Sequence, residues 1–116
     1  MLKNILEISG VIAVVQFKDN AQAELMQFHG ALDQASAEQL GRFAYDHKRM
    51  LQGMADVFAM LKLTPGETEW TPLRGWVIRG ATRSVCSWAG LVCLVDNDKA
   101  KVNEVLKKLD ETAFMI

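Results

Sequence analysis

The sequence predicts an α+β domain in which a five-stranded antiparallel sheet carries one long helix on one face and two shorter helices on the other. Two observations predict this class. Five short segments rich in β-branched and apolar residues are bounded by turn residues, and a long run from Ser36 to about Lys62 has helical periodicity. Because the first and last strands have no polar side, both faces of the sheet need a cover.

The length and charge of the chain indicate one ordinary domain, residues 1–116. The 116 residues are enough to bury a core, and 50% of them are hydrophobic and 23% charged, as in soluble globular domains. Thirteen basic residues against fourteen acidic ones give a net charge of −1. The basic excess that is typical of nucleic-acid-binding domains is therefore missing, and we expect no nucleic-acid partner.

The N-terminal segment does not read as an export signal. Glu7 interrupts its apolar run, and the polar residues Gln16, Lys18, Asp19 and Asn20 lie where the apolar region of a signal peptide would meet its cleavage site. No stretch approaches the roughly 18 consecutive apolar residues of a membrane span. With only two cysteines, we expect a cytoplasmic protein whose thiols are reduced.

The first third of the chain predicts a short helix followed by a hairpin. Apolar residues at helical spacing indicate a helix over residues 1–9. The almost wholly apolar segment VIAVVQF, residues 11–17, indicates a strand covered on both faces. Residues 18–20 form a turn, and residues 24–29 return as the second strand.

The long helix is the most informative element. After a connector over residues 30–35, Ser36 and Gln39 have the spacing of a capping box, which predicts the helix start. Its apolar stripe is about 160° wide, against about 100° for an ordinary surface helix, so we expect a second copy of the chain to cover the remainder. The stripe contains Leu40, Phe43, Ala44, His47, Met50, Leu51, Met54, Ala55, Val57, Phe58 and Leu61.

Gly53 lies inside this predicted helix. A glycine there costs about 1 kcal/mol relative to alanine. It either permits a close approach of another helix or is simply tolerated. Pro65 and Gly66 end the helix, because neither continues it well.

The last third predicts three short strands and a final helix. The strands cover residues 75–80, 83–88 and 91–95, and Ala89-Gly90 forms the last turn. Asp96, Asn97 and Asp98 are a candidate N-cap cluster for an amphipathic helix over residues 101–114. The complete order is α-β-β-α-β-β-β-α.

Three stretches give the chain a resemblance to the roadblock family, the dynein light chain fold that is related to longin and profilin domains. They are ILEISGVIAVVQFKDN near the start, the long central helix, and LVCLVDNDKAKVNEVLKKLDE near the end. The chain is most similar to the small stand-alone bacterial members, whose role is not established. It departs from the family in a longer segment between the long helix and the third strand, residues 63–73.

The resemblance implies a homodimer in which the long helices lie side by side and a sheet continues across the two-fold axis. It also implies a regulatory or scaffolding role, since relatives of this fold modulate Ras-like small GTPases or tether motor and signalling complexes. We therefore interpret the chain as a non-enzymatic homodimeric adaptor. Its surface would dock a protein partner, such as a Ras-like small GTPase or a multi-subunit complex.

Two sets of residues are candidates for these contacts. The predicted dimer interface is Phe43, His47, Met50, Met54, Val57 and Leu61. The predicted partner contact is Trp70, Arg74 and Trp76. Aromatic side chains alternate with arginines in this region, a composition that favours a protein contact over single-stranded nucleic acid.

The remaining motifs give no catalytic, cofactor or metal site. Gly75, Gly80 and Thr82 have the spacing of a phosphate-binding loop, but Ala81 replaces its lysine. A lone histidine in an apolar stripe is usually a satisfied core or interface residue, although at a dimer axis His47 would couple association to pH. No carboxylate pair is placed for acid–base catalysis, and the histidines and cysteines lack metal-ligand spacing.

Cys86 and Cys93 support an alternative function. If Ala89-Gly90 is a two-residue turn, the two cysteines face each other across the hairpin. Such a pair suits a thiol-based redox or sulfur-handling protein. The other interpretation is two buried small hydrophobic residues, since cysteine is among the most buried residue types.

Overall fold

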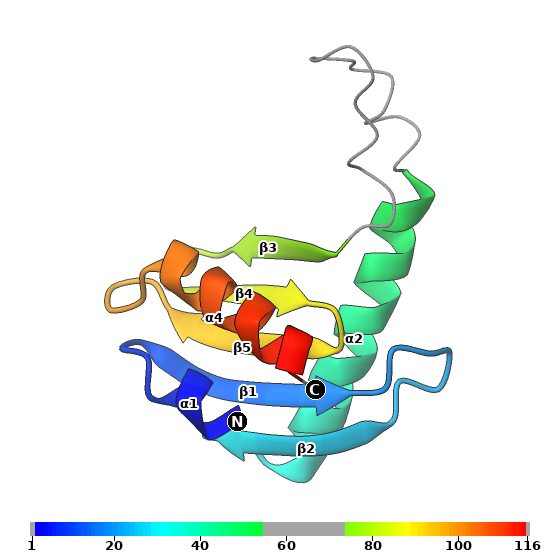
Figure 1. Cartoon of the computed structure of the whole chain (residues 1–116), viewed down its shortest axis with the longest axis horizontal. Helices are drawn as coiled ribbons and strands as arrows, with labels where there is room; N and C mark the ends of the chain where they lie inside the picture. The colour runs from blue at the N-terminus through cyan, green and yellow to red at the C-terminus, as the bar shows by residue number, and fades with distance from the viewer. Residues whose placement is uncertain (1, 55–73, 116) are drawn as a thin grey trace.

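The computed structural model describes residues 2–54 and 74–115, and these residues form the predicted α+β arrangement in the predicted order (Figure 1). The five strands make one antiparallel sheet with helices on both faces. The elements are α1 (Leu2–Leu6), β1 (Val11–Phe17), β2 (Leu25–Gly30), α2 (Gln34–Gly53), β3 (Gly75–Arg79), β4 (Arg83–Trp88), β5 (Leu91–Asp96) and α4 (Val102–Met115).

The strand order in the sheet is β2-β1-β5-β4-β3. The hairpin β1–β2 and the meander β3–β4–β5 are joined by the pairing of β1 with β5. Of the three interior strands, β1 and β5 are the most apolar, which suits strands that have a layer of helix above and below. The two edges of the sheet are β2 and β3.

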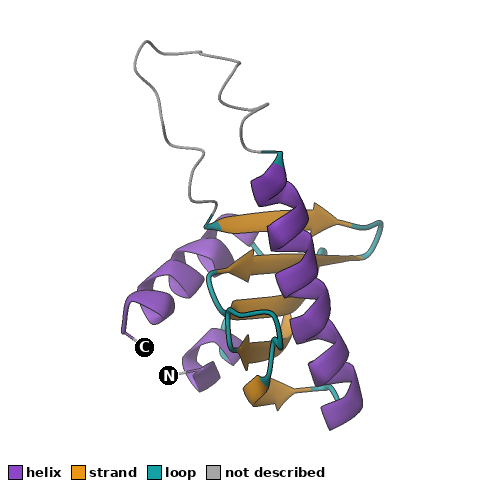
Figure 2. Ribbon diagram, turned by 90° about the vertical axis from the view of Figure 1, so that its right-hand side faces the viewer, coloured by secondary structure: helices purple, strands orange, loops and turns teal. Residues whose placement is uncertain are grey.

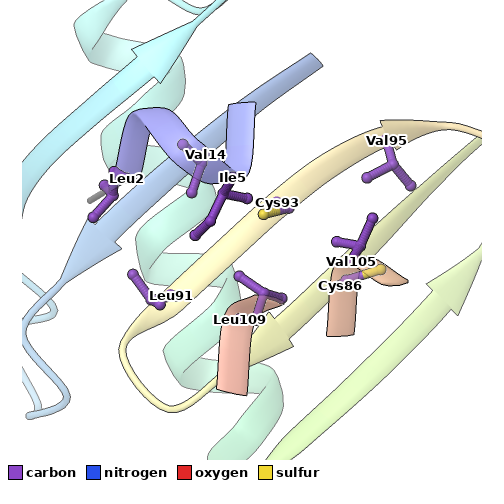
Figure 3. Close-up of a cluster of buried hydrophobic side chains, with 9 residues drawn as sticks. All are labelled: Leu2, Ile5, Val14, Cys86, Leu91, Cys93, Val95, Val105 and Leu109. Atoms are coloured by element: carbon purple, nitrogen blue, oxygen red, sulfur yellow. The ribbon is translucent and has the colours of Figure 1, made fainter. Parts of the chain in front are cut away.

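One face of the sheet is covered by α1 and α4, and the other by α2 (Figure 2). Beneath α1 and α4 lies a cluster of fully or almost fully buried side chains (Figure 3). These side chains are Leu2, Ile5, Val14, Cys86, Leu91, Cys93, Val95, Val105 and Leu109. This cluster contains the large aliphatic side chains of the core.

Helix α2 packs closely on its face through small residues. Ala37, Gly41 and Ala44 are its buried residues. A Cβ atom at Gly41 would lie 3.2 Å from the Cβ of Phe17, so the helix backbone rests almost directly on the sheet. The contact with Trp76 and Val92 extends this second cluster across the sheet to β3.

Helix α2 begins earlier than the sequence analysis predicted. Asp33 is the N-cap, and its carboxylate accepts a hydrogen bond of 2.7 Å from the backbone N–H of Ser36. The predicted capping box of Ser36 and Gln39 is therefore wrong. The backbone N–H of Ser36 is held by the Asp33 side chain, which places Ser36 inside the first turn instead of before it.

The end of α2 also differs. The helix was predicted to continue to about Lys62, but it ends at Gly53, where the N–H of Met54 bonds the carbonyls of Leu51 and Gln52. Glycine has the lowest helix propensity after proline, which explains an end at this position. Residues 55–73, and the predictions that concern them, lie outside the described residues.

The Asp96–Asp98 segment forms a turn before α4 instead of capping it. The Asp96 carboxylate accepts from the N–H of Asp98, and the Asp96 carbonyl accepts from the N–H of Ala100. Asn97 uses its side-chain amide to bind the carbonyl of Gly80, which ties this turn to the β3–β4 loop. None of the described helices is both long and apolar enough to cross a membrane.

Candidate functional site

The outer flank of α2 and the adjoining end of the sheet expose a group of large apolar side chains. Phe43 and Met50 on α2 are 44% and 55% exposed, Met54 directly after α2 is 46% exposed, and Ile78 on β3 is 37% exposed. We call this group the α2–β3 surface, and it consists of Phe43, His47, Met50, Met54, Trp76 and Ile78. Scattered exposed apolar residues are normal, whereas several on neighbouring elements make a candidate interaction site.

The spacing of the helix residues in this surface is regular. Residues 43, 47, 50 and 54 follow one another at intervals of four, three and four. At 100° per residue, Phe43 and Met50 lie about 20° apart on the helix, and the position of Met54, the residue after the helix, would lie about 40° from that of Met50. An alternation of three and four is typical of a helix that packs lengthwise against another helix.

Three aromatic rings connect the helix to the sheet at this surface. The rings of Phe43 and His47 stack with centroids 5.6 Å apart. Trp76 meets His47 edge to face at 4.6 Å and Phe43 at 5.9 Å. These contacts join three members of the α2–β3 surface, Phe43, His47 and the buried Trp76, into one packed group across α2 and β3.

Trp76 carries an unusual polar group. Its side chain is only 8% exposed, and its indole Nε1 has no hydrogen-bond partner. It is the one buried side-chain nitrogen or oxygen atom of the described residues that lacks a partner. Native proteins pair the large majority of such groups, so this one requires an explanation.

The two edges of the sheet differ in regularity. Strand β3 pairs with β4 over five residues without a break, and its outer edge pairs with no described strand. Strand β2 carries a bulge, because Gln27 pairs with Gln16 while Leu25 pairs with Phe17, which leaves Met26 extra. Bulges are one of the devices that protect sheet edges from pairing with other chains.

Of the predicted interface residues, Phe43, His47 and Met50 lie on α2, and Met54 follows its last residue. Trp76, predicted as a partner contact, lies against two of them and is buried, so it belongs to the same surface. Ile78 was missed by the sequence analysis, although its alternation with Trp76 in GWVIR places both on one side of the strand. Three predicted contacts lie outside the described residues: Val57, Leu61 and Trp70.

Arg74 lies at a different place. It is exposed just before β3 and contributes to a cavity of about 300 Å³ beside the C-terminal end of α4. Lys48 and Asp110 supply further charges to this cavity, and Trp88 and the exposed Phe114 supply aromatic walls. The predicted partner contact is therefore divided between two sites.

The two cysteines face each other as predicted. Cys86 on β4 is paired in register with Cys93 on β5 across the turn at Ala89-Gly90. Both thiols are fully buried in the cluster beneath α4 (Figure 3). Burial raises the pKa of both thiols because it penalises the thiolate, and the charge of Arg79 offsets only part of this at Cys86. Such thiols are poor nucleophiles and poor metal ligands.

Two further candidate motifs have structural explanations. The segment between Gly75 and Gly80 is strand β3, and a turn and strand β4 follow it instead of the helix N-terminus of a phosphate-binding loop. Within residues 2–54 and 74–115, no three His, Cys, Asp or Glu side chains are grouped as a metal site would need.

Comparisons with known proteins agree with the architecture. A family profile described as "Uncharacterized conserved protein (DUF2173)" matches residues 1–111. The crystal structure of a Roadblock/LC7 domain from Streptomyces avermitilis superposes with a TM-score of 0.75 at 13% sequence identity, covering 96% of this chain and 86% of that one. No curated protein matches the chain. The predicted roadblock resemblance is thus confirmed at the level of the fold.

Proposed function

This chain belongs to the DUF2173 family of uncharacterised conserved proteins, and from its roadblock fold and its surface we propose that it is a homodimeric, non-enzymatic adaptor or regulatory protein. The observation that carries the proposal is the α2–β3 surface. A single copy leaves Phe43, Met50, Met54 and Ile78 of this surface exposed to water, and a second copy would cover them.

The second copy is the occupant that the helix pattern favours. Residues 43, 47, 50 and 54 form a narrow lengthwise seam, which suits an equally long and narrow partner such as another α2 helix. An isologous contact uses the same residues on both sides, so one apolar flank meets its own equivalent. Each buried apolar side chain of this size contributes roughly 1.5–3 kcal/mol when fully covered.

The edge of β3 supports the same arrangement. It lacks proline and bulges, and the charged Arg79 lies only at its end. A regular, unprotected edge beside an apolar patch favours continuation of the sheet into a second chain. The β3 edges and the α2 seams of two copies would then form one joint interface.

The partner of the dimer would be a protein, such as a Ras-like small GTPase or a multi-subunit complex of the cytoplasm. The cavity beside α4 is the candidate contact. Arginine and aromatic residues are enriched at the energetic centres of protein interfaces, and Arg74, Trp88 and Phe114 are of these types. Arg74→Glu is expected to abolish capture of the partner from native cytosol while it leaves the dimer intact.

The test of the dimer uses two methionines that are equally exposed. Met50 on α2 is 55% exposed and Met26 on β2 is 54% exposed. Met50→Glu would place a charge in the seam and is expected to give a monomer in light scattering at micromolar concentration. Met26→Glu is the matched control and is expected to remain dimeric. A wild-type protein that is monomeric under these conditions would refute the proposal.

A further inference from the structure

The cavity beside the C-terminal end of α4 brings charges of both signs next to aromatic rings. Its volume of about 300 Å³ is at the lower end of the range for small-molecule sites, roughly 300–1,000 Å³. Its charged side chains are Lys48 on α2, Arg74 just before β3, and Asp110 on α4. What the cavity can bind depends on which of these charges is already paired within the chain.

The lysine of the cavity is already paired. The ammonium of Lys48 forms an ion pair with the carboxylate of Asp19, and the Lys48 side chain is only 16% exposed. Arg74 and Asp110 are both exposed, and neither forms an ion pair with any residue that the structure describes. Although both line this cavity, they do not pair with each other. The cavity therefore presents one guanidinium and one carboxylate to an incoming molecule.

Two aromatic rings supply the apolar part of the cavity. Phe114 is 93% exposed, and Trp88 is partly buried against the cluster beneath α4. Trp88 pairs with Gly75 across β3 and β4, and its ring occupies the space where a Cβ atom of Gly75 would lie. The backbone of Arg74 is held at the same place, because its carbonyl accepts a hydrogen bond of 2.8 Å from the N–H of Ala89. One small molecule in this cavity would therefore contact both the charges and the rings.

We propose that this cavity binds a small zwitterion with an apolar side chain, such as a free aromatic or large aliphatic amino acid. The guanidinium of Arg74 would hold the carboxylate, for which its planar fork is suited. The carboxylate of Asp110 would hold the ammonium group, and the rings of Trp88 and Phe114 would cover the side chain. A molecule with only one of the two charges would leave either Asp110 or Arg74 without its counterpart.

The same cavity is the proposed contact with a protein partner, so a bound ligand would regulate that contact. Only this regulation rests on the proposed function, because the ligand site needs neither the dimer nor the partner. Ligand binding is measured on the purified wild-type protein and on its Met50→Glu variant, and both are expected to bind. Intact ligand binding without capture of a partner would refute the partner contact alone, so the two failures are distinguishable.

Three probes that share a phenyl ring separate the two charges. L-Phenylalanine carries both charges, phenethylamine lacks the carboxylate, and hydrocinnamate lacks the ammonium group. In NMR titrations at neutral pH, we expect phenylalanine to have a dissociation constant about tenfold lower than that of either analogue, because each analogue loses one charge-assisted hydrogen bond. Equal binding of the three probes, or no binding of phenylalanine at millimolar concentration, would overturn the proposal.

Substitutions assign each charge of the ligand to a residue. Arg74→Gln is expected to remove the preference for phenylalanine over phenethylamine and to keep the preference over hydrocinnamate, and Asp110→Asn is expected to do the reverse. Arg79→Gln and Glu104→Gln are matched controls, since both side chains are exposed and lie outside the cavity, and both proteins are expected to bind as the wild type does. Unchanged preferences in Arg74→Gln and Asp110→Asn would overturn the proposal.

Discussion

The two faces of the sheet are built in different ways. Beneath α1 and α4, aliphatic side chains interdigitate and are almost completely buried. Beneath α2, the fully buried helix residues are Ala37, Gly41 and Ala44; Leu40, Tyr45 and Leu51 pack against the same cluster while partly exposed, and Phe43 and Met50 are exposed. The first face is packed with large, fully buried aliphatic side chains, whereas the second is packed through small helix residues and leaves the large side chains of Phe43 and Met50 exposed.

The largest expected effect on stability comes from a substitution in the core beneath α1 and α4. Leu109 on α4 is fully buried in the cluster with Cys93 and Val105. Leu109→Ala should lower the free energy of unfolding by about 2–5 kcal/mol through lost burial and a residual cavity. Urea unfolding of the monomeric Met50→Glu background measures this without a contribution from the dimer. A loss under about 1 kcal/mol would mean that this face tolerates cavities, against our description.

The close approach of α2 to the sheet gives the next effect. A side chain at Gly41 would meet Phe17, since a Cβ there already lies 3.2 Å from the Phe17 Cβ. Gly41→Leu should lower the free energy of unfolding by about 1–3 kcal/mol through overpacking. Thermal unfolding followed by circular dichroism measures the change. A stabilised Gly41→Leu protein would show that α2 can shift outward freely.

Gly53 is the matched control for Gly41 because a Cβ there meets nothing within 4 Å. Gly53→Ala should raise the free energy of unfolding by about 0.5–1 kcal/mol, since alanine has the higher helix propensity. The same unfolding measurement applies. A loss of stability would indicate that this glycine has a packing role instead of being tolerated.

The thiols give an effect that depends on pH. Burial holds the pKa of Cys86 and Cys93 above the ordinary value of 9.0, so above about pH 9 the folded state binds more protons than the unfolded state. Stability should therefore fall as the pH rises beyond that value, and a Cys86→Ala, Cys93→Ala protein should lose this part of the dependence. Native thiols should also stay unreactive towards a disulfide reagent until the protein unfolds. Fast paired reactivity would revive the redox alternative.

The smallest expected effect on stability comes from a substitution at the exposed Met50 on the α2 face of the sheet. Met50→Glu should change the free energy of unfolding of the monomer by no more than about 0.5 kcal/mol, as for other surface substitutions. The same change should dissociate the dimer. An effect on association without an effect on folding would distinguish the α2 face of the sheet from the face beneath α1 and α4.

Local patterns in the sequence predicted the strand register correctly where a short turn fixes the geometry. The two-residue turn at Ala89-Gly90 determines the register of β4 and β5, so the pairing of Cys86 with Cys93 was predicted correctly. The start of α2 was not predicted correctly, because Asp33 and Ser36 are both good cap residues and spacing alone does not choose between them. The burial of Trp76 depends on a helix more than 25 residues away in the chain, which no local pattern records.

The bulge at Met26 would limit the size of an assembly built by sheet pairing. If two copies join along β3, the combined sheet ends on both sides at β2, and there the irregular hydrogen-bonding row offers no template for a third molecule. Growth would stop at a closed pair, and the chain would be kept from polymerising into fibres by one additional residue in an outer strand.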